Sequence, residues 1–552
     1  MRFLTFRPRL VECLRGYNRG QFGADLTAGI TVGIVALPLA MAFAIASGVA
    51  PEAGIITAVI AGFIISAFGG SRVQIGGPTG AFIVIVYGIL TEYGASNLAV
   101  CTIMAGFILL IMGFAGLGQA IKYIPYPVTV GFTSGIAVLI LSTQIKDFLG
   151  LDLDKVPSAF LDKCAALGGS LGTTHLPTAL LAISALLLII FWPKKWMRVV
   201  PGSVVALVLG TVVVAVFKLP VETIGTRFGG IPEGLPPLHV PEFSFSELGR
   251  LIQPATTIAL LAAIESLLSA VVADGMIDDR HDSNQELKAQ GLANIFCPLF
   301  GGIAATGAIA RTATNVKSGG RTPVAGMIHA VTLLVILLAA APLAKSVPLA
   351  VLAAVLVKVA YNMGEWHHFK RLFKWPRSDA AVFLTTFALT VLFDLTLAVE
   401  VGMILAAILF IKRVADTSQI TPVDASTDTE GPQHSLLGKD IPDEVQVFRI
   451  LGPFFFGVAD RLETALKRAQ REPKVVILRM RKVTAMDATG LNALENLYEK
   501  LRKKNRQLVI SALQPQPHKA LKKSGLLARI GAENICPDID AALARAHTLL
   551  SE

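Results

Sequence analysis

Long apolar runs separated by short polar breaks fill most of the first 415 residues of the chain. A helix needs about 20 apolar residues to cross the hydrocarbon core of a bilayer. Shorter runs, or runs interrupted by Gly and Pro, lie at 53–68, 78–92, 286–304 and 310–317. With these, the pattern predicts an all-α polytopic membrane domain of about fourteen spans. The clearer runs lie at 25–46, 97–117, 126–146, 177–193, 202–217, 253–273, 322–342, 346–361, 378–393 and 396–413.

The density of charged residues divides the chain. Charged residues make up 16% of the sequence and hydrophobic residues 53%, whereas a soluble globular protein has about 25% charged residues. Lys, Arg, Asp and Glu return at ordinary density only from Arg413 onward. We therefore predict a membrane domain at 1–415, a linker rich in Thr, Asp, Ser, Gly and Pro at 416–443, and a soluble domain at 444–552.

The basic residues predict an orientation in the lipid bilayer. They gather before the first span, at 194–198, at 370–377 and at 412–413. This is the positive-inside pattern of membrane proteins, so the net charge of +10 does not indicate a nucleic-acid partner. An even number of spans places both termini on one side, which these groups predict to be the cytoplasm. The acidic stretch at 274–286 falls on the same side, where acidic residues carry little weight.

Two stretches share a pattern that predicts an internal repeat. Phe68-Gly69-Gly70 is followed, ten residues after its first residue, by Pro78-Thr79, and Phe300-Gly301-Gly302 is followed at the same distance by Ala310-Arg311. Equivalent spans lie seven apart, and because seven is odd they run in opposite directions. A 7+7 inverted repeat follows from this interpretation. The alternative is a chance match in a Gly-rich chain.

The first stretch predicts a helix that begins inside the membrane. Gly76-Gly77-Pro78 breaks the apolar run, and Pro78 suits the first helical position, where its missing N–H does no harm. The helix that follows, at about 79–90, is too short to span a bilayer, and irregular backbone at this depth must be buried in protein or line an aqueous cavity. Its N-terminal N–H groups and partial positive charge suit an anion. The alternative is a kink in a structural helix.

Arg311 adds a full positive charge near the start of the second short helix, after Thr306-Gly307-Ala308. An Arg at mid-membrane costs about 2.5–3.5 kcal/mol on insertion scales, so it needs a partner or water. Two facing helix N-termini would contribute about 0.3–2 kcal/mol each toward an anion, and the guanidinium adds bidentate geometry for a carboxylate or sulfate. The alternative is a charge that faces the cytoplasm and sets topology.

Glu265 lies in an apolar run, 257–273, that holds no basic residue. A lone carboxylate in a membrane is protonated, bound to a cation or paired with Arg. Ser269, four residues later, shares its helix face. We expect Glu265 to couple a proton or Na⁺ to anion movement. The alternative is a structural pair with Arg311, and the two roles are compatible.

Phe43 lies in the first span, five residues after Pro38 and among small residues. Small residues let helices approach closely, and Pro38 frees a backbone carbonyl. Phe43 is therefore a candidate for lining the cavity, with plain packing in the bundle as the alternative.

Together these stretches resemble the SulP family, the bacterial relatives of animal solute carrier family 26. The resemblance covers nearly the whole chain in the family's order, and it includes 25–33, the segment at Gly77, 263–268, Asn284-Gln285-Glu286-Leu287 and 307–315. It implies core and gate domains, alternating access of an elevator kind, and a homodimer in the bacterial inner membrane. The family transports small anions.

The resemblance also implies the site. In such proteins the anion lies between the N-terminal ends of the third and tenth helices, and the cation or proton position here falls on Glu265 and Ser269, with backbone from Gly307 and Ala308. Many sulfate transporters of the family have Gln after the Pro of the first helix, whereas this chain has Leu39, which argues against a sulfate-type pocket. The implied substrate-binding residues are Thr79, Gly80, Ala81, Ile309, Ala310, Arg311 and Phe43.

Within the family, 263–276 and 301–315 look most like the bacterial C4-dicarboxylic acid transporter. This implies succinate, fumarate, malate or aspartate as the substrate, with sulfate and bicarbonate as alternatives. Glu rather than Asp at position 265 favours a proton over Na⁺, because a carboxyl group in apolar surroundings is more readily neutral.

The soluble tail alternates strand-like and helical stretches, which predicts a small α/β domain. Strand-like runs lie at 445–451, 475–478 and 507–512, and Asp487 opens a helix. In SulP proteins such a tail resembles the STAS domain, akin to anti-sigma factor antagonists, in which a phosphorylated Ser often follows this Asp. Ala488 stands there, and Thr489 is a poorer acceptor, so we expect no such switch. Asp487 is expected to cap the helix, and the tail to serve assembly or regulation.

Three classes of function remain: a coupled carrier, an anion channel or motor-like protein, and a membrane sensor that signals through the tail. Glu265 favours the carrier, because a channel needs no coupling carboxylate. No nucleophile–base set or P-loop is present, so no enzyme is expected. The scattered cysteines form no C-x-x-C pair and predict neither a disulfide framework nor a zinc site. We expect no metal and no cofactor beyond the coupling ion.

Overall fold

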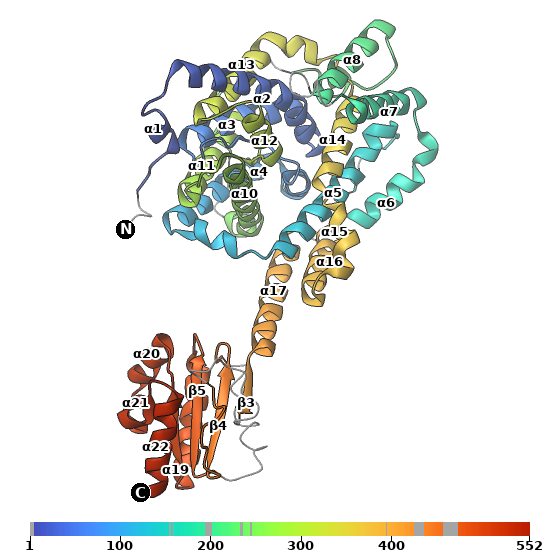
Figure 1. Ribbon diagram of the computed structural model, residues 1–552. Helices are drawn as coiled ribbons and strands as arrows, with labels where there is room; N and C mark the ends of the chain where they lie inside the picture. Colours follow the sequence, from blue (N-terminus) through green and yellow to red (C-terminus); the bar gives the residue numbers. More distant parts are fainter. Residues whose placement is uncertain are drawn as a thin grey trace. The chain divides into compact units, whose positions relative to one another are not determined.

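The computed structural model describes residues 5–153, 156–157, 159–193, 201–231, 234, 236–242, 246–393, 395–423, 435–455 and 473–552. Its contacts separate two compact units, Met1–Ile404 and Leu405–Glu552. Figure 1 shows that the first unit is helical and that the second is built around a sheet. The predicted basic group at 194–198 and part of the predicted linker at 416–443 lie outside the described residues.

Helices follow the apolar runs throughout the first unit, and each of the fourteen predicted spans is helical over at least part of its length. The predicted spans 78–92 and 97–117 form one element, α4 (Phe82–Phe114), which Gly94 breaks with φ 82° and ψ 174°. The others are α2 (Arg19–Ala46), α3 (Pro51–Phe68), α5 (Tyr126–Leu149), α7 (Leu176–Phe191), α8 (Gly202–Phe217), α10 (Leu248–Ile277), α11 (Ser283–Phe296), α12 (Ile309–Lys317), α13 (Pro323–Ala344), α14 (Leu349–Met363), α16 (Arg377–Leu392) and α17 (Leu395–Thr417).

Six helical stretches of the described residues are long and apolar enough to cross a bilayer by length and composition alone. The remaining spans are shorter or more polar, so their backbone and polar side chains need neighbouring protein. Shorter helices precede or connect the spans: α1 (Arg9–Cys13), α6 (Phe160–Gly169), α9 (Ile224–Phe228) and α15 (Trp366–Arg371).

The helices of the first unit pack as two groups, which lie side by side in Figure 1. We call them the first and the second helix group. The first contains α2, α3, α4, α10, α11, α12 and α13, and the second contains α5, α7, α8, α14 and α16. Fewer contacts join the groups, among them those of α2 with α14 and α8. The groups correspond to the expected core and gate domains.

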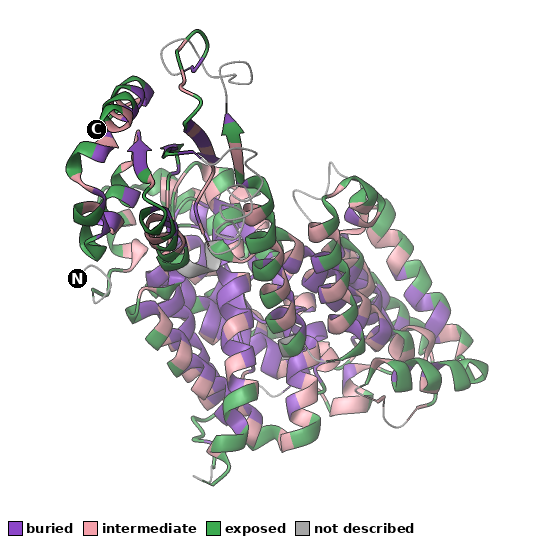
Figure 2. Ribbon diagram, turned by 90° about the horizontal axis from the view of Figure 1, so that it is seen from below, coloured by how far each residue is buried: buried purple, intermediate pink, exposed green. Residues whose placement is uncertain are grey.

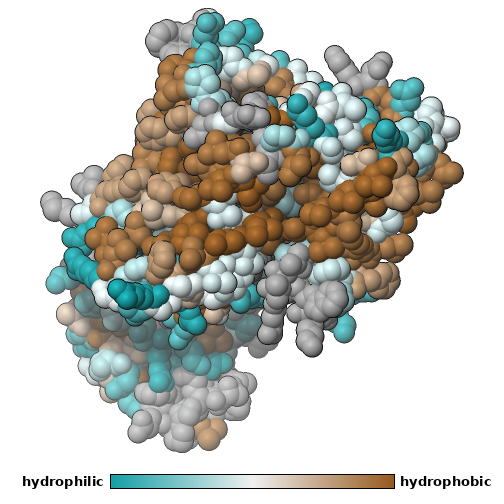
Figure 3. Space-filling view, turned by 90° about the horizontal axis from the view of Figure 1, so that it is seen from above, coloured by the Kyte–Doolittle hydropathy of each residue, from teal (hydrophilic) through white to brown (hydrophobic). Residues whose placement is uncertain are grey.

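Apolar side chains cover the outside of the helices as well as the interior. Buried residues gather inside the bundle (Figure 2), and a broad hydrophobic band crosses the face in Figure 3. Ile111 is 66% exposed and Phe191 is 76% exposed. So large an apolar surface would be unfavourable in water, which agrees with a surrounding bilayer.

A five-stranded sheet forms the second unit, with the order β3-β4-β5-β6-β7. β3 is antiparallel to β4, and the other neighbours are parallel. β5 is apolar on both faces because helices cover both sides of the parallel strands. Asp487 caps α19 as expected, since its Oδ1 accepts a hydrogen bond of 2.7 Å from the N–H of Gly490. The elements are β3 (Gln419–Val423), β4 (Val445–Leu451), β5 (Val475–Lys482), β6 (Gln507–Ser511), β7 (Ile535–Cys536), α19 (Ala488–Lys503), α20 (Pro515–Ser524), α21 (Leu526–Ile530) and α22 (Ile539–Ser551).

Two glycines let α4 and α11 cross at backbone distance. A Cβ on Gly106 of α4 would lie 2.7 Å from the carbonyl oxygen of Gly291, and a Cβ on Gly291 of α11 would lie 2.7 Å from the carbonyl oxygen of Gly106. Small residues at helix crossings are typical of membrane proteins, where close packing replaces the hydrophobic effect.

Gly291→Ala tests this crossing, because the added methyl group meets rigid backbone. We expect the change to reduce stability by about 1–3 kcal/mol, the usual cost of overpacking, and to lower the thermal unfolding midpoint of the purified protein in detergent. Gly275→Ala is the control, since a Cβ on Gly275 of α10 meets nothing within 4 Å. Equal midpoints for the two variants would contradict the crossing.

Candidate functional site

The two predicted helix breaks pair with each other. β1 (Gly76–Gly77) and β2 (Thr306–Gly307) form a two-stranded antiparallel ladder, in which Gly76 lies opposite Gly307 and Gly77 lies opposite Thr306. The N–H of Ala308 extends the pairing with a hydrogen bond of 2.8 Å to the carbonyl oxygen of Ile75. Irregular backbone at membrane depth must be satisfied by protein, and here each break supplies the partners of the other.

Side chains of α10 and α12 hold the first break in place. Gln74 Nε2 donates to Ser266 Oγ of α10 at 2.8 Å. The N–H of Ile75 donates to Thr312 Oγ1 of α12 at 3.0 Å. Asn315 Nδ2 of α12 donates to a backbone carbonyl oxygen just before the break, at 2.8 Å. All these groups are buried, so the bonds replace contacts that water would otherwise make.

The polar side chains of α11 support both breaks. Glu286 Oε2 accepts hydrogen bonds from the N–H groups of Gly70 at 2.9 Å and Ser71 at 3.2 Å. Asn294 both donates to the carbonyl oxygen of Ala305 and accepts from its N–H, each at 2.9 Å. Glu286 was expected only as part of a family motif, and Asn294 was not predicted. The sequence does indicate both residues, because Glu286, Gln290 and Asn294 follow one another at four-residue spacing and so share one helix face.

The short helices begin beside this ladder. Thr79, Gly80 and Ala81 form the turn before α4, which starts at Phe82, so the predicted start at Thr79 is three residues too early. Ile309, Ala310 and Arg311 are the first residues of α12. Neither start has a side-chain cap, and uncapped helix N-termini present N–H groups and a partial positive charge.

Arg311 lies at the centre of the arrangement with an exposed fraction of 3%. Its Nη2 donates to the carbonyl oxygen of Pro78. Its Nη1 is buried and has no hydrogen-bond partner among the described residues. Gly77, at φ 143°, makes room for the guanidinium, because a Cβ there would lie 2.6 Å from Nη1. The Nη1 amino group of the guanidinium therefore remains available as a donor in the buried site.

Glu265 contacts the first break and not Arg311. Thr79 Oγ1 donates to Glu265 Oε2 at 2.7 Å. The described residues contain no ion pair between Glu265 and Arg311, so the alternative of a direct structural pair is not what the structure shows. Ser269 shares the helix with Glu265, but its hydroxyl donates to Thr312 Oγ1 at 3.2 Å. The structure therefore joins Glu265 to Thr79 and directs Ser269 elsewhere.

Gly80 lies where the two helix groups meet. A Cβ on Gly80 would lie 3.5 Å from Phe43 Cε1 of α2, 3.1 Å from Ile140 Cδ1 of α5 and 3.8 Å from Met363 Sδ of α14. Phe43 therefore lies next to Gly80 across the site. Ile140 and Met363 come from the second helix group. Neither was predicted, because nothing in an apolar span distinguishes the residue that faces a distant turn.

Comparisons with known proteins agree with this architecture. The chain matches the model of the Sulfate permease family over residues 22–386 and that of the STAS domain over residues 439–542. It is 45% identical over 522 residues to the "Putative sulfate transporter YvdB" of Bacillus subtilis (strain 168), covering 94% of this chain and 97% of that protein. It is 35% identical over 526 residues to the bicarbonate transporter BicA of a Picosynechococcus strain, covering 91% of this chain and 90% of that protein.

Solved structures are similar as well. The transmembrane domain of a cyanobacterial bicarbonate transporter, BicA, matches with a TM-score of 0.63 at 34% identity, covering 71% of this chain and 98% of that chain. Murine Slc26a9 in the inward-facing state matches with a TM-score of 0.86 at 17% identity, covering 99% of this chain and 94% of that chain. The second likeness concerns the fold alone.

The names of these relatives are those of transporters and not of enzymes, and they refer to sulfate and bicarbonate. The expected closeness to a C4-dicarboxylic acid transporter is therefore not supported. The matched family model covers well over half of the chain. The chain belongs to the Sulfate permease family, the SulP family of its sequence resemblance, and carries a STAS domain near its C-terminus.

Proposed function

We propose that this chain is a secondary transporter of a small oxyanion, with bicarbonate as the first candidate substrate and a proton as the coupling ion. The observation that carries the proposal is the buried Nη1 of Arg311, which has no partner among the described residues. An unsatisfied buried donor costs about 1–3 kcal/mol, and a charged one costs more. A bound anion would remove this cost. Ile309 and Ala310 at the start of α12, and Gly80 and Ala81 before α4, surround the proposed position.

Charge favours a small substrate. Arg311 is the Lys or Arg side chain that, in the described part of the chain, hydrogen-bonds to the first break, and its Nη2 is already engaged with Pro78. A C4-dicarboxylate has two separated carboxylates and would need a second cationic partner. A single small oxyanion matches one guanidinium donor and one hydroxyl. The similarity to a bicarbonate transporter supports this choice, and sulfate is the second candidate because of the relative named for it.

The hydrogen bond between Thr79 and Glu265 supports proton coupling. While Glu265 is ionised, it accepts the hydroxyl proton of Thr79, so Thr79 presents only lone pairs to the site and an anion is disfavoured. Once Glu265 is protonated, its own O–H can donate to Thr79 Oγ1, and the Thr79 O–H is free to donate to the anion. Protonation also leaves the charge of Arg311 without an opposing carboxylate nearby. One proton thus prepares the site for one negative charge.

Sodium coupling is less favoured by the contacts. The Na⁺ ligands implied by the family resemblance are engaged in hydrogen bonds within the protein. Ser269 bonds to Thr312, Gly307 pairs with Gly76 in the ladder, and the N–H of Ala308 bonds to Ile75. Backbone carbonyl oxygens can still accept a cation, so the measurements below include Na⁺.

Alternating access would follow from movement of the first helix group along the second, as in an elevator. Arg311 and Thr79 belong to the first group, whereas Ile140 and Met363 close the site from the second. We further propose that residues 1–415 carry transport, that 444–552 regulate or assemble the protein through the linker at 416–443, that the protein is a homodimer, and that both termini are cytoplasmic.

Glu265→Gln tests the coupling step. Gln keeps the shape and can donate an N–H to Thr79 Oγ1, so it imitates the protonated carboxyl group. We expect the variant to transport at a rate that no longer changes with pH, whereas wild-type uptake into proteoliposomes should rise on acidification by up to about tenfold per pH unit, the limit for one proton.

Glu52→Gln is the matched control for this measurement. Glu52 is a second partly buried carboxylate of the first helix group, in α3, and its substitution should leave the pH dependence intact. If Glu265→Gln retained the wild-type profile, or if Glu52→Gln lost it, the role of Glu265 would be refuted. Repeating the assay without Na⁺ separates proton from sodium coupling.

Arg311→Ala tests the anion site. A hydrogen bond to a charged group contributes about 1.5–3 kcal/mol, so we expect the KM for the anion to rise by at least about tenfold. The KM of Arg311→Lys should lie between those of wild type and Arg311→Ala. A single ammonium group keeps the charge, but it cannot bond to Pro78 and to the anion through two separate nitrogens as a guanidinium does. The thermal midpoint of each variant checks folding, and an unchanged KM in a folded Arg311→Ala protein would reject the site.

A substrate panel in proteoliposomes decides between the candidate functions. Labelled bicarbonate, sulfate, succinate, fumarate and aspartate are supplied with and without a pH gradient, and counterflow is measured with unlabelled anion inside. A carrier of small oxyanions should show trans-stimulated exchange with bicarbonate or sulfate but not with the dicarboxylates. A flux without trans-stimulation would indicate a channel, and no flux with any anion would favour the sensor.

A further inference from the structure

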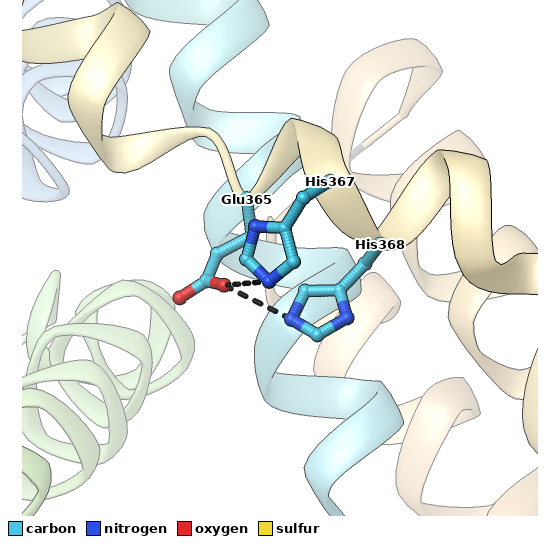
Figure 4. A group of neighbouring side chains, drawn as sticks. All are labelled: Glu365, His367 and His368. Atoms are coloured by element: carbon cyan, nitrogen blue, oxygen red, sulfur yellow. Dashed lines mark ion pairs between the residues drawn. The ribbon is translucent and has the colours of Figure 1, made fainter.

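One cluster of ligand-type side chains lies outside the anion site. Glu365 follows the end of α14, and His367 and His368 lie in the first turn of α15. Both imidazole rings approach the same carboxylate oxygen in Figure 4: Glu365 Oε2 lies 3.6 Å from His367 Nε2 and 3.0 Å from His368 Nε2. The nearest ligand-type atoms of the three side chains all lie within 4.8 Å of one another.

The surrounding side chains bury the ring of His368 and leave the ring of His367 exposed to solvent. His368 has a side-chain exposure of 9%, and its ring is edge-on to Tyr126, the first residue of α5, with centroids 5.6 Å apart. The hydroxyl of Tyr126 lies 2.9 Å from His368 Nε2, a contact that a metal ion bound to this nitrogen would replace. By contrast, the side chains of His367 and Glu365 are 58% and 43% exposed. The cluster thus combines a positioned ligand with two ligands that solvent can reach.

The spacing fits a transition metal. Zn²⁺ binds His nitrogen and carboxylate oxygen at about 2.0–2.2 Å in tetrahedral geometry, which places neighbouring ligand atoms about 3.3–3.5 Å apart. The two nitrogen–oxygen distances above lie on either side of this value. Two imidazoles and one carboxylate suit Zn²⁺, Cu²⁺ or Ni²⁺ and not Mg²⁺ or Ca²⁺, which prefer oxygen ligands alone. The alternative to a metal site is an ion pair between Glu365 and one protonated histidine. Such a pair would involve one imidazole ring, whereas here two rings, with centroids 3.9 Å apart, approach the same carboxylate oxygen.

We propose that Glu365, His367 and His368 bind one divalent transition-metal ion, with Zn²⁺ as the first candidate and water in the remaining position. No metal site was expected from the sequence, since the scattered cysteines predict none, and two adjacent histidines close to a Glu are a weaker pattern than paired cysteines. The site lies in the second helix group. It is two residues from Met363, which closes the anion site next to Gly80. A bound ion would tie the end of α14 to α15 and restrain that residue.

Metal content tests the proposal directly. The full chain, purified in detergent with an affinity tag that contains no histidine, is equilibrated with zinc chloride, desalted and assayed for zinc. We expect wild type to retain one more zinc ion per chain than His367→Gln. His367 is exposed, so its substitution should not disturb folding, and an unchanged thermal midpoint without metal verifies this. His547→Gln, at an exposed position in α22, is the control and should bind as wild type does.

Further measurements test the coordination geometry of the metal and the effect of its binding on stability and anion uptake. Co²⁺ in place of Zn²⁺ should give the visible absorption of a tetrahedral ion in wild type and not in His367→Gln. Zinc should also raise the thermal midpoint of wild type, since a ligand that binds the folded state stabilises it, and it should slow anion uptake only where the site is intact. Equal zinc content in wild type and His367→Gln would overturn the proposal. Zinc binding retained by Arg311→Ala separates this site from the transport site.

Discussion

The pairing of β1 with β2 is the constraint on which the rest of the helical unit depends. A helix interrupted inside a membrane leaves N–H and C=O groups that need partners from protein or from a water-filled cavity, and each unsatisfied group costs several kcal/mol. Gly76 and Gly77 meet Thr306 and Gly307, so the breaks satisfy each other. This pairing brings the starts of α4 and α12 together. The geometry of the proposed anion site therefore follows from the pairing of the two breaks.

The charges of the site depend on the same short segment. Arg311 donates to the carbonyl oxygen of Pro78, and the hydroxyl of the next residue, Thr79, donates to Glu265. Two consecutive residues thus connect a cation and a carboxylate that do not contact each other. In the proposed coupling, a change in the protonation of Glu265 would alter what Thr79 offers to an anion, without any movement of the backbone. Coupling by this route needs only the exchange of donor and acceptor in one hydrogen bond.

The two helix groups make different contributions. The first group contains the ladder formed by β1 and β2, the buried polar side chains that bond to it, and the charged residues. Within this group, α4 and α11 cross at backbone distance at Gly106 and Gly291. The second group contributes the apolar side chains of Ile140 and Met363. Around Gly80, backbone of the first group therefore faces apolar side chains of the second group, which suits the proposed movement of one group along the other.

The spans, the two breaks and the candidate charges were predictable from the sequence, because a bilayer imposes a length on apolar runs and makes every Gly-Pro break or buried charge conspicuous. Arg311 and Glu265 stood out for that reason. Their partners did not, since the bond from Thr79 to Glu265 joins residues 186 positions apart in the chain and depends on how the helices pack. The hydrogen-bond partners of Glu286 and Asn294 and the position of Met363 beside Gly80 were likewise decided by tertiary structure. The local sequence pattern identifies the polar and charged residues that lie within apolar spans, whereas only the packing of the helices determines which of them contact each other.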